Sequence, residues 1–141
     1  MPVPDRLKPV ALLATLALLG PAGCAGSNLA RVTGQVVANG VPVQLDQGES
    51  VQIDFATADQ AYPPLALGVF AKKDGTFVAD MNDGTGAGLR PGKYKVRLNG
   101  ESTSVKAKVN PKLFKEAVVI DTAVGAPVRL TIDLAAGTIT Q

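Results

Sequence analysis

The sequence has 141 residues, enough for one domain and short for two, and its 14 basic and 12 acidic residues give a formal net charge of +2. This balance argues against a nucleic-acid-binding protein, which needs a concentrated excess of basic residues. The chain has no histidine and one cysteine, which excludes catalytic triads and pairs that need histidine, zinc sites that contain histidine, and an internal disulfide.

Residues 1–23 have the layout of a secretory signal peptide. The basic residues Arg6 and Lys8 precede an apolar run at 10–19, which is followed by the small residues Gly20, Ala22 and Gly23. The apolar run is shorter than the roughly 20 residues that an ordinary spanning helix needs. A buried core helix is the alternative, but such a helix would not lie between a basic start and a Gly/Ala-rich end. We therefore predict that the protein is exported.

The single cysteine, Cys24, directly follows the pair Ala22-Gly23. The segment resembles a lipobox, the motif at which a bacterial lipoprotein carries its lipid-accepting cysteine, although Pro21 occupies a position where that motif usually has leucine. The alternative is ordinary cleavage after Ala25, which removes the cysteine with the signal. We predict lipidation of Cys24, since two acyl chains anchor a protein stably. Residues 24–30 would then be a short tether, and the protein a lipid-anchored component of the bacterial cell envelope.

Beyond residue 30, apolar and polar residues alternate with a period of two, which predicts strands rather than helices. The segment 31–40 places Val32 and Val36 on one face and ends in Asn39-Gly40, a dipeptide typical of a tight hairpin. The segment 50–57 alternates in the same way. Its apolar face carries Val51, Ile53 and Phe55, and its polar face carries Gln52 and Asp54.

The segment 65–81 predicts two strands joined around Asp74-Gly75. Phe77, Ala79 and Met81 share a face of the second of these strands. The segment 101–117 is ambiguous, because residues 104–109 alternate like a strand while Pro111 favours the start of one helical turn.

Three further strands are predicted at 93–98, which directly follows a Pro91-Gly92 turn, and at 117–122 and 127–134. The first is expected to turn Lys93, Lys95 and Arg97 to solvent and to bury Tyr94, Val96 and Leu98. The last is expected to bury Val128, Leu130, Ile132 and Leu134. About seven short strands over roughly a hundred residues predict an all-β domain, a β-sandwich, at 31–135. Residues 136–141 are assigned to a C-terminal tail.

Five motifs occur in a specific order. They are VTGQVVANGVPV at 32–43, VQIDFAT at 51–57, KKDGTFVA at 72–79, LRPGKYKVRL at 89–98 and VRLTIDL at 128–134. This order resembles the carboxypeptidase-regulatory-like, transthyretin-like domain of small bacterial lipoproteins. That family has a V-x-G-x-V strand followed by G-x-P-V, an xDGxF hairpin, a PGxYxV strand and a closing apolar strand. The resemblance implies a seven-stranded, Ig-like or prealbumin-like sandwich attached to a membrane, without catalytic residues, in which Phe77 and Tyr94 are core aromatics.

The Gly- and Asp-rich segment 80–88 is one candidate binding loop. An EF-hand calcium loop needs oxygen ligands at positions 1, 3 and 5, Gly at 6 and Glu at 12. Counted from Asp80, the fifth, sixth and twelfth positions are Gly84, Thr85 and Pro91, so the pattern fails. No Gly-Lys-Ser/Thr follows for phosphate binding. The sequence therefore indicates no metal, no cofactor and no catalytic residues, and the segment is expected to be a turn-rich connection.

A possible basic surface is the second candidate site. Lys93, Lys95 and Arg97 form one row, and Lys106 and Lys108 form another that would add to it if the two segments paired. Such a patch would attract anionic lipid or acidic envelope polymers. The alternative is that these are the solvated side chains of strands with one buried face.

Three function classes are compatible with these features. The first is a non-enzymatic lipoprotein with a structural or protein-binding role in the cell envelope, and we favour it. The second is a carbohydrate- or polymer-binding module, which the absence of tryptophan disfavours unless Tyr62 or another aromatic lines a groove. The third is an enzyme, which the absence of histidine disfavours. The expected partners are the membrane, through the lipid anchor, and envelope proteins or polymers, but not nucleic acid.

Overall fold

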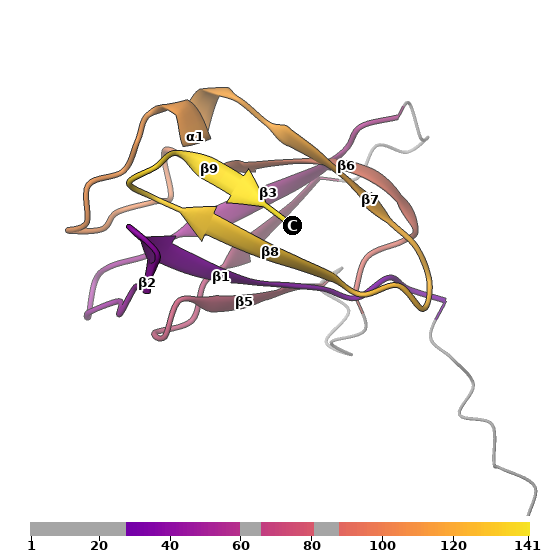
Figure 1. The fold of residues 1–141 in the computed structure, drawn as a ribbon, viewed down its shortest axis with the longest axis horizontal. Coiled ribbons are helices and arrows are strands. Elements are labelled where there is room, and N and C mark those ends of the chain that lie inside the picture. The colour runs from indigo at the N-terminus through magenta and orange to yellow at the C-terminus, as the bar shows by residue number, and fades with distance from the viewer. Residues whose placement is uncertain (1–27, 60–65, 81–87) are drawn as a thin grey trace, which may run out of the picture.

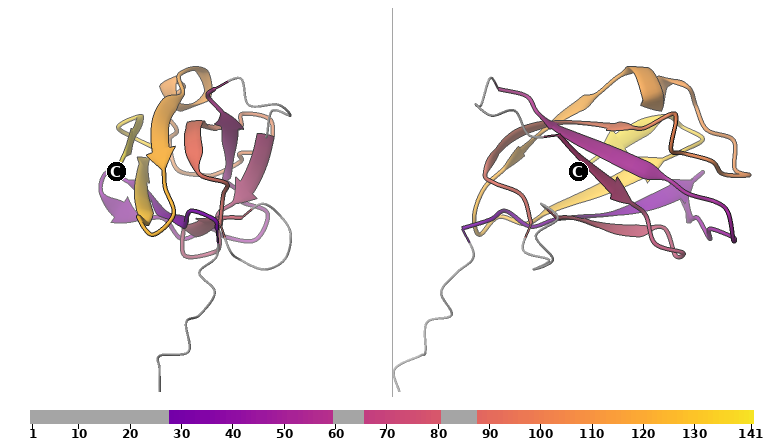
Figure 2. Two further views of the ribbon diagram at one scale, coloured as in Figure 1. Left: turned by 90° about the vertical axis from the view of Figure 1, so that its right-hand side faces the viewer. Right: turned by 180° about the vertical axis from the view of Figure 1, so that it is seen from behind.

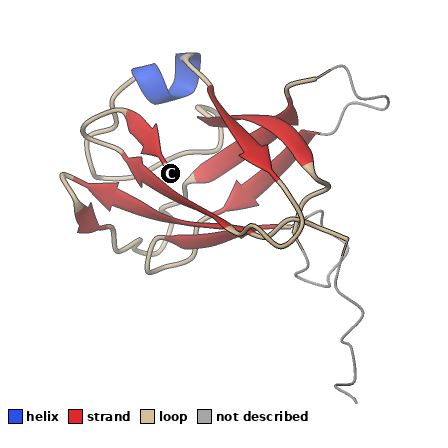
Figure 3. Cartoon of the chain, turned by 45° about the vertical axis from the view of Figure 1, so that its right-hand side comes forward, coloured by secondary structure: helices blue, strands red, loops and turns tan. Residues whose placement is uncertain are grey.

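A computed structural model describes residues 28–59, 66–80 and 88–141. Two β-sheets pack face to face as a sandwich, with one short helix at its side (Figure 1, Figure 2, Figure 3). The elements in chain order are β1 (Val32–Ala38), β2 (Val41–Pro42), β3 (Gln52–Thr57), β4 (Ala66–Phe70), β5 (Thr76–Ala79), β6 (Gly92–Leu98), α1 (Lys112–Lys115), β7 (Val118–Thr122), β8 (Val128–Asp133) and β9 (Thr138–Thr140).

The five-stranded sheet is built around β1. Strand β8 runs parallel to β1 on one side, while β5 and the short β2 pair antiparallel with successive halves of β1 on the other. Strand β9 pairs with the outer side of β8. The four-stranded sheet has the order β4-β3-β6-β7, and every pair in it is antiparallel. The predicted all-β sandwich is confirmed, and seven of the described strands have four or more residues.

The inward faces of both sheets form one apolar core, as the alternation of the sequence predicts. Tyr94, Val96 and Leu98 of β6 are buried, and Lys93, Lys95 and Arg97 between them are exposed. Burial follows the same period in β3 and β8. The side chains that lose all or nearly all contact with solvent include Val32, Val36, Val51, Ile53, Phe55, Phe77, Leu130, Ile132 and Leu134.

Two glycine-containing turns differ in what they connect. Asn39 and Gly40 both have positive φ, 52° and 77°, and join β1 to β2 in the expected hairpin. Gly75, with φ of 78°, closes a local turn through hydrogen bonds between residues 72, 75 and 76. The hairpin that the family resemblance implies at this turn is wrong, because β4 pairs with β3 and β5 pairs with β1 in the other sheet. The chain crosses between the sheets here.

The ambiguous segment at 101–117 contains the predicted helical turn but no strand. Pro111 is the N-cap of α1. Residues 105–109 alternate in burial, with Val105 and Val109 packed against the core and Lys106 and Lys108 exposed, yet they belong to neither sheet. An irregular chain crossing the open edge of a sandwich alternates like a strand because one side of it still faces apolar residues.

Both ends of the predicted domain extend further than expected. The C-terminal tail assigned to 136–141 instead contains β9, whose Ile139 is buried against the core. Gly137, with φ of 73°, makes the tight turn that returns the chain along β8. At the other end, Ala30, assigned to the tether, is fully buried and exchanges two backbone hydrogen bonds with Leu89. The packed domain therefore spans 30–140.

Candidate functional site

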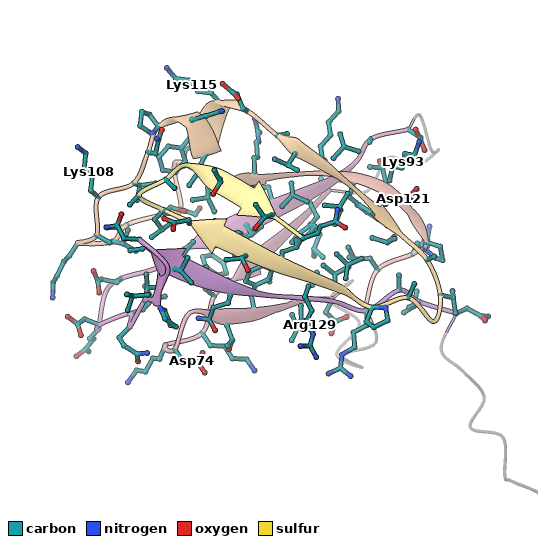
Figure 4. All side chains as sticks on the ribbon, in the orientation of Figure 1. Asp74, Lys93, Lys108, Lys115, Asp121 and Arg129 are labelled. Carbon is teal, nitrogen blue, oxygen red and sulfur yellow. The ribbon has the colours of Figure 1, made fainter. Side chains whose placement is uncertain are left out.

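The predicted basic row lies on the outer face of the four-stranded sheet. Strand β6 is central in that sheet, between β3 and β7, so Lys93, Lys95 and Arg97 project from the middle of the face. Lys93 lies opposite Asp121 of β7 (Figure 4). Arg97 lies opposite Asp54 of β3. Among the described residues, none of the three cations forms an ion pair.

Lys106 and Lys108 do not join this row. The segment that carries them is not paired with β6, and Lys108 lies at the opposite end of the molecule from Lys93 (Figure 4). Lys106 instead forms an ion pair with Asp46, and its backbone N–H donates to Glu49. The five-cation patch considered from the sequence is therefore not assembled.

These contacts give Lys106 a structural function. Its ammonium group holds the pKa of Asp46 below the usual range, while Asp46 raises the pKa of Lys106. Backbone N–H groups of Asp46 and Lys106 lower the pKa of Glu49. The cluster fastens the loop at 46–49 to the chain at 106, which sequence spacing did not indicate because the partners are 60 residues apart.

A shallow groove of about 310 Å³ lies beside the basic row. Its floor is made of small residues, Ala56, Ala66 and Gly68, and the longer side chains of Lys95 and Arg97 stand beside it. Asp54, Phe55, Leu67 and Ala117 complete the lining. The groove exists because glycine and alanine occur where the neighbouring strand carries long basic side chains.

Asp54 is the carboxylate in this lining, and two amides fix it. Gln52 Nε2 donates to Asp54 Oδ1 at 2.9 Å, and Asn99 Nδ2 donates to Asp54 Oδ2 at 3.0 Å. A Cβ at Gly68 would lie 2.3 Å from Gln52 Nε2, so any side chain at residue 68 would displace this amide. The neutral amides hold the carboxylate, and the guanidinium of Arg97 is left to solvent.

A second polar network supports the start of β6. Tyr94 Oη donates to the carbonyl oxygen of Arg90 at 2.7 Å, and burial raises the pKa of the Tyr94 phenol. The buried hydroxyl of Thr122 donates to Gly92 O at 2.9 Å and accepts from Gly92 N at 3.1 Å. These bonds satisfy the backbone of the Pro-Gly turn and serve structure rather than binding.

Asp133 connects two turns of the five-stranded sheet through backbone hydrogen bonds. Its carboxylate accepts backbone N–H bonds from Asn39, Gly40, Ala135 and Ala136 at 3.0–3.2 Å. Four donors around one carboxylate lower its pKa, with the Ala136 N–H as the largest cause. Asp133 thus links the β1–β2 turn to the β8–β9 turn, a contact across 93 or more residues that alternation alone does not reveal.

Several positions singled out in the sequence fall outside the described residues: Cys24, Tyr62, Met81 and most of the segment 80–88. Within the described residues there is no group of three or more Cys, Asp or Glu side chains placed to hold a metal ion. The same part of the chain contains no helix with the length and apolarity needed to cross a membrane.

Comparison with known proteins identifies the fold alone. No protein-family model matches the sequence, and no curated protein matches it. A solved DUF3823 family protein from Parabacteroides merdae has a similar structure, with a TM-score of 0.50 and 18% identity over 75% of this chain and 45% of that chain. A DUF3823 protein from Bacteroides ovatus has a TM-score of 0.46 and 17% identity over 75% of this chain and 44% of that one. An (S)-allantoin synthase has a TM-score of 0.47 and 13% identity over 82% of this chain and 44% of that chain.

The chain therefore spans less than half the length of each of these structures. At such identity, the likeness to the first extends to its β-rich architecture and not to any residue of a site.

Proposed function

We propose that this protein is an exported, lipid-anchored and non-enzymatic module of the bacterial cell envelope that binds a protein partner. The signal-like segment and Cys24 support export and anchoring. The two-sheet sandwich, with Phe77 and Tyr94 in its core, supports the prealbumin-like assignment made from the motifs. The partner-binding surface in this proposal is the outer face of the four-stranded sheet.

One observation carries the binding proposal: three exposed cations without ion pairs among the described residues stand in a row beside a hollow in the same face. Asp121 and Asp54 lie opposite the two outer cations of the row, but no carboxylate lies opposite Lys95, so an acidic partner would supply the opposite charge that this central position lacks. The groove is open and floored by small residues, so it suits an extended segment better than an enclosed small molecule. The partner is therefore expected to present acidic side chains on an extended segment.

An acidic carbohydrate or other envelope polymer is the alternative ligand. The positive charge of the basic row favours an acidic polymer as much as it favours an acidic protein segment. The groove lining, however, contains a single aromatic residue, Phe55, which is fully buried, so no ring among the described lining residues is offered for stacking on a sugar. We therefore place a protein partner first.

Site-specific photocrosslinking in the native membrane tests the proposal. A photoreactive residue at Lys95 should give a discrete protein adduct, and the yield should fall when Lys93 and Arg97 are replaced by glutamine. The matched control is Thr131, which is exposed on the outer face of the five-stranded sheet. The same adducts from both positions would contradict a specific face, and adducts with polymer alone would favour the alternative.

A further inference from the structure

The end of the sandwich at which the described chain begins combines an exposed apolar side chain with exposed arginines. We define the entry end as residues 30–31, 89–92 and 122–127. Backbone hydrogen bonds connect these three segments. Ala30 and Leu89 exchange hydrogen bonds of 2.7 and 2.8 Å, and Val128 N donates to Arg31 O at 2.9 Å. Gly92 is paired with Thr122. The β7–β8 turn and the start of β1 lie together at this end in every view (Figure 1, Figure 2).

The apolar component is Val124 in the turn between β7 and β8. This residue is 52% exposed, and the turn around it presents Ala123, Ala126 and Pro127 to solvent as well. Gly125 and Pro127 are common turn formers, so the apolar surface of this turn comes mainly from Val124 and its two neighbouring alanines. Every residue from 123 to 127 is exposed and either apolar or small, so the turn has no charged side chain that would oppose contact with a bilayer interface.

The charged component is a pair of arginines beside that turn. Arg31 and Arg90 directly follow the two residues of the Ala30–Leu89 bridge, and both are exposed. Neither forms an ion pair among the described residues. Lys93 is nearby, but it faces Asp121 across the strands and is not counted. Two exposed guanidinium groups beside this turn can bind the phosphates of an anionic membrane, although Asp121 borders the same end.

The position of the proposed anchor brings this end to the membrane. Ala30 is six residues from Cys24, and an extended chain of that length spans at most about 21 Å. A lipid on Cys24 therefore keeps the entry end within reach of the headgroups, while the Asn39-Gly40 turn lies at the other end of the sandwich (Figure 1). We propose that the entry end docks on anionic phospholipid, with Val124 in the headgroup region and Arg31 and Arg90 on lipid phosphates. This inference rests on the anchoring in the proposed function.

Tryptophan fluorescence tests the docking directly, because the chain contains no tryptophan. Val124→Trp reports on the entry end, and Val41→Trp is the matched control, since Val41 is 65% exposed on β2 at the far end. A chain starting at Cys24 keeps every described strand pair and the core of the sandwich. It can be coupled through its single thiol to maleimide phospholipid in vesicles with or without phosphatidylglycerol.

On phosphatidylglycerol vesicles, the emission of the Val124→Trp variant should shift to the blue, resist acrylamide and be quenched by headgroup nitroxide lipid. The Val41→Trp variant should show none of these changes. The double variant Arg31→Gln, Arg90→Gln should lower the ratio of docked to undocked protein about 30-fold at low salt, because each charge contributes about 1 kcal/mol. If Val124→Trp disturbs the fold by circular dichroism, Ala126→Trp replaces it as the reporter.

Equal quenching of the two reporters, or equal exposure of both to acrylamide, would overturn the docking. Chemical coupling supplies the anchor whether or not the cell lipidates Cys24. Docking of the coupled protein together with an unlipidated native N-terminus would refute the proposed anchor only. A lipidated native protein without docking would refute this inference only.

Discussion

Gly34 of β1 lies directly opposite Phe77 of β5, and the Phe77 ring occupies the space that a side chain at residue 34 would need. A Cβ on Gly34 would lie 2.1 Å from Phe77 Cζ and 2.8 Å from the backbone oxygen of Leu130. The glycine of the V-x-G-x-V motif is therefore required for packing between three adjacent strands, and its φ is not the reason for its presence.

Gly34→Ala should destabilise the fold by about 1–3 kcal/mol, because both the ring and the neighbouring strand must move. Chemical denaturation followed by circular dichroism measures this loss. Shortening the obstacle with Phe77→Leu should make the alanine less harmful in the double variant, although the Leu130 carbonyl still opposes it. Gly100→Ala is the control, since its Cβ would have no neighbour closer than 3.6 Å. Equal losses at residues 34 and 100 would contradict the packing role.

Asp133 should make stability depend on pH. Its folded-state pKa is lowered from 3.8 by four backbone N–H donors, so the unfolded chain binds the proton more tightly. The stabilisation is complete above the ordinary pKa and is lost as the pH falls through the folded value. Asp133→Asn should lower the melting temperature at pH 7, because its amide nitrogen would face the Gly40 N–H in place of an acceptor. It should also reduce the loss of stability below about pH 4. A variant that melts like the parent across this range would refute the prediction.

Tyr94 separates the contribution of ring burial from that of a hydrogen bond. Tyr94→Phe keeps the ring and removes the donor to Arg90 O, and should cost about 1 kcal/mol. Tyr94→Ala removes the buried ring as well and should cost about 3–5 kcal/mol. Urea unfolding of both variants gives the comparison. If the phenylalanine variant is as unstable as the alanine variant, the bond to Arg90 outweighs packing.

The basic row should bind an acidic peptide in a salt-dependent way. Replacing Lys93, Lys95 and Arg97 by glutamine should weaken binding of a glutamate-rich peptide about tenfold at low salt, from roughly 0.5 kcal/mol for each exposed pair. The difference should shrink at physiological salt, where screening acts within about 8 Å. A matched triple variant at Lys72, Lys73 and Lys108 changes the net charge equally on other surfaces. Equal weakening by the two variants would show that net charge alone acts.

The native N-terminus should carry lipid on Cys24. Intact-mass measurement of protein from its own membrane checks this, and Cys24→Ser should abolish the modification. An unmodified chain beginning at Gly26 would show instead that ordinary cleavage removes the cysteine.

The sequence predicted the sandwich because most strands bury one face, which forces strict alternation. In β6 this placed six consecutive side chains correctly, from Lys93 to Leu98. It did not predict β9, whose three residues carry a single buried side chain, Ile139, too few to establish a period. It also did not predict that Lys106 binds Asp46, or that small residues opposite the basic row leave a groove. Such features depend on which strands become neighbours, and periodicity within one strand carries no information about that.

The parallel pairing of β1 with β8 joins Val32 to Val128 and thereby closes a loop that contains most of the domain. The central pair of the five-stranded sheet is therefore absent until synthesis has passed residue 133, and contacts between such distant segments form slowly. The pairs of β1 with β2 and β5, and of β3 with β4 and β6, need no residue beyond 98, so the late strand supplies the closure of the five-stranded sheet. Under the proposed export, this late closure favours completion of the sheet after the chain has crossed the membrane.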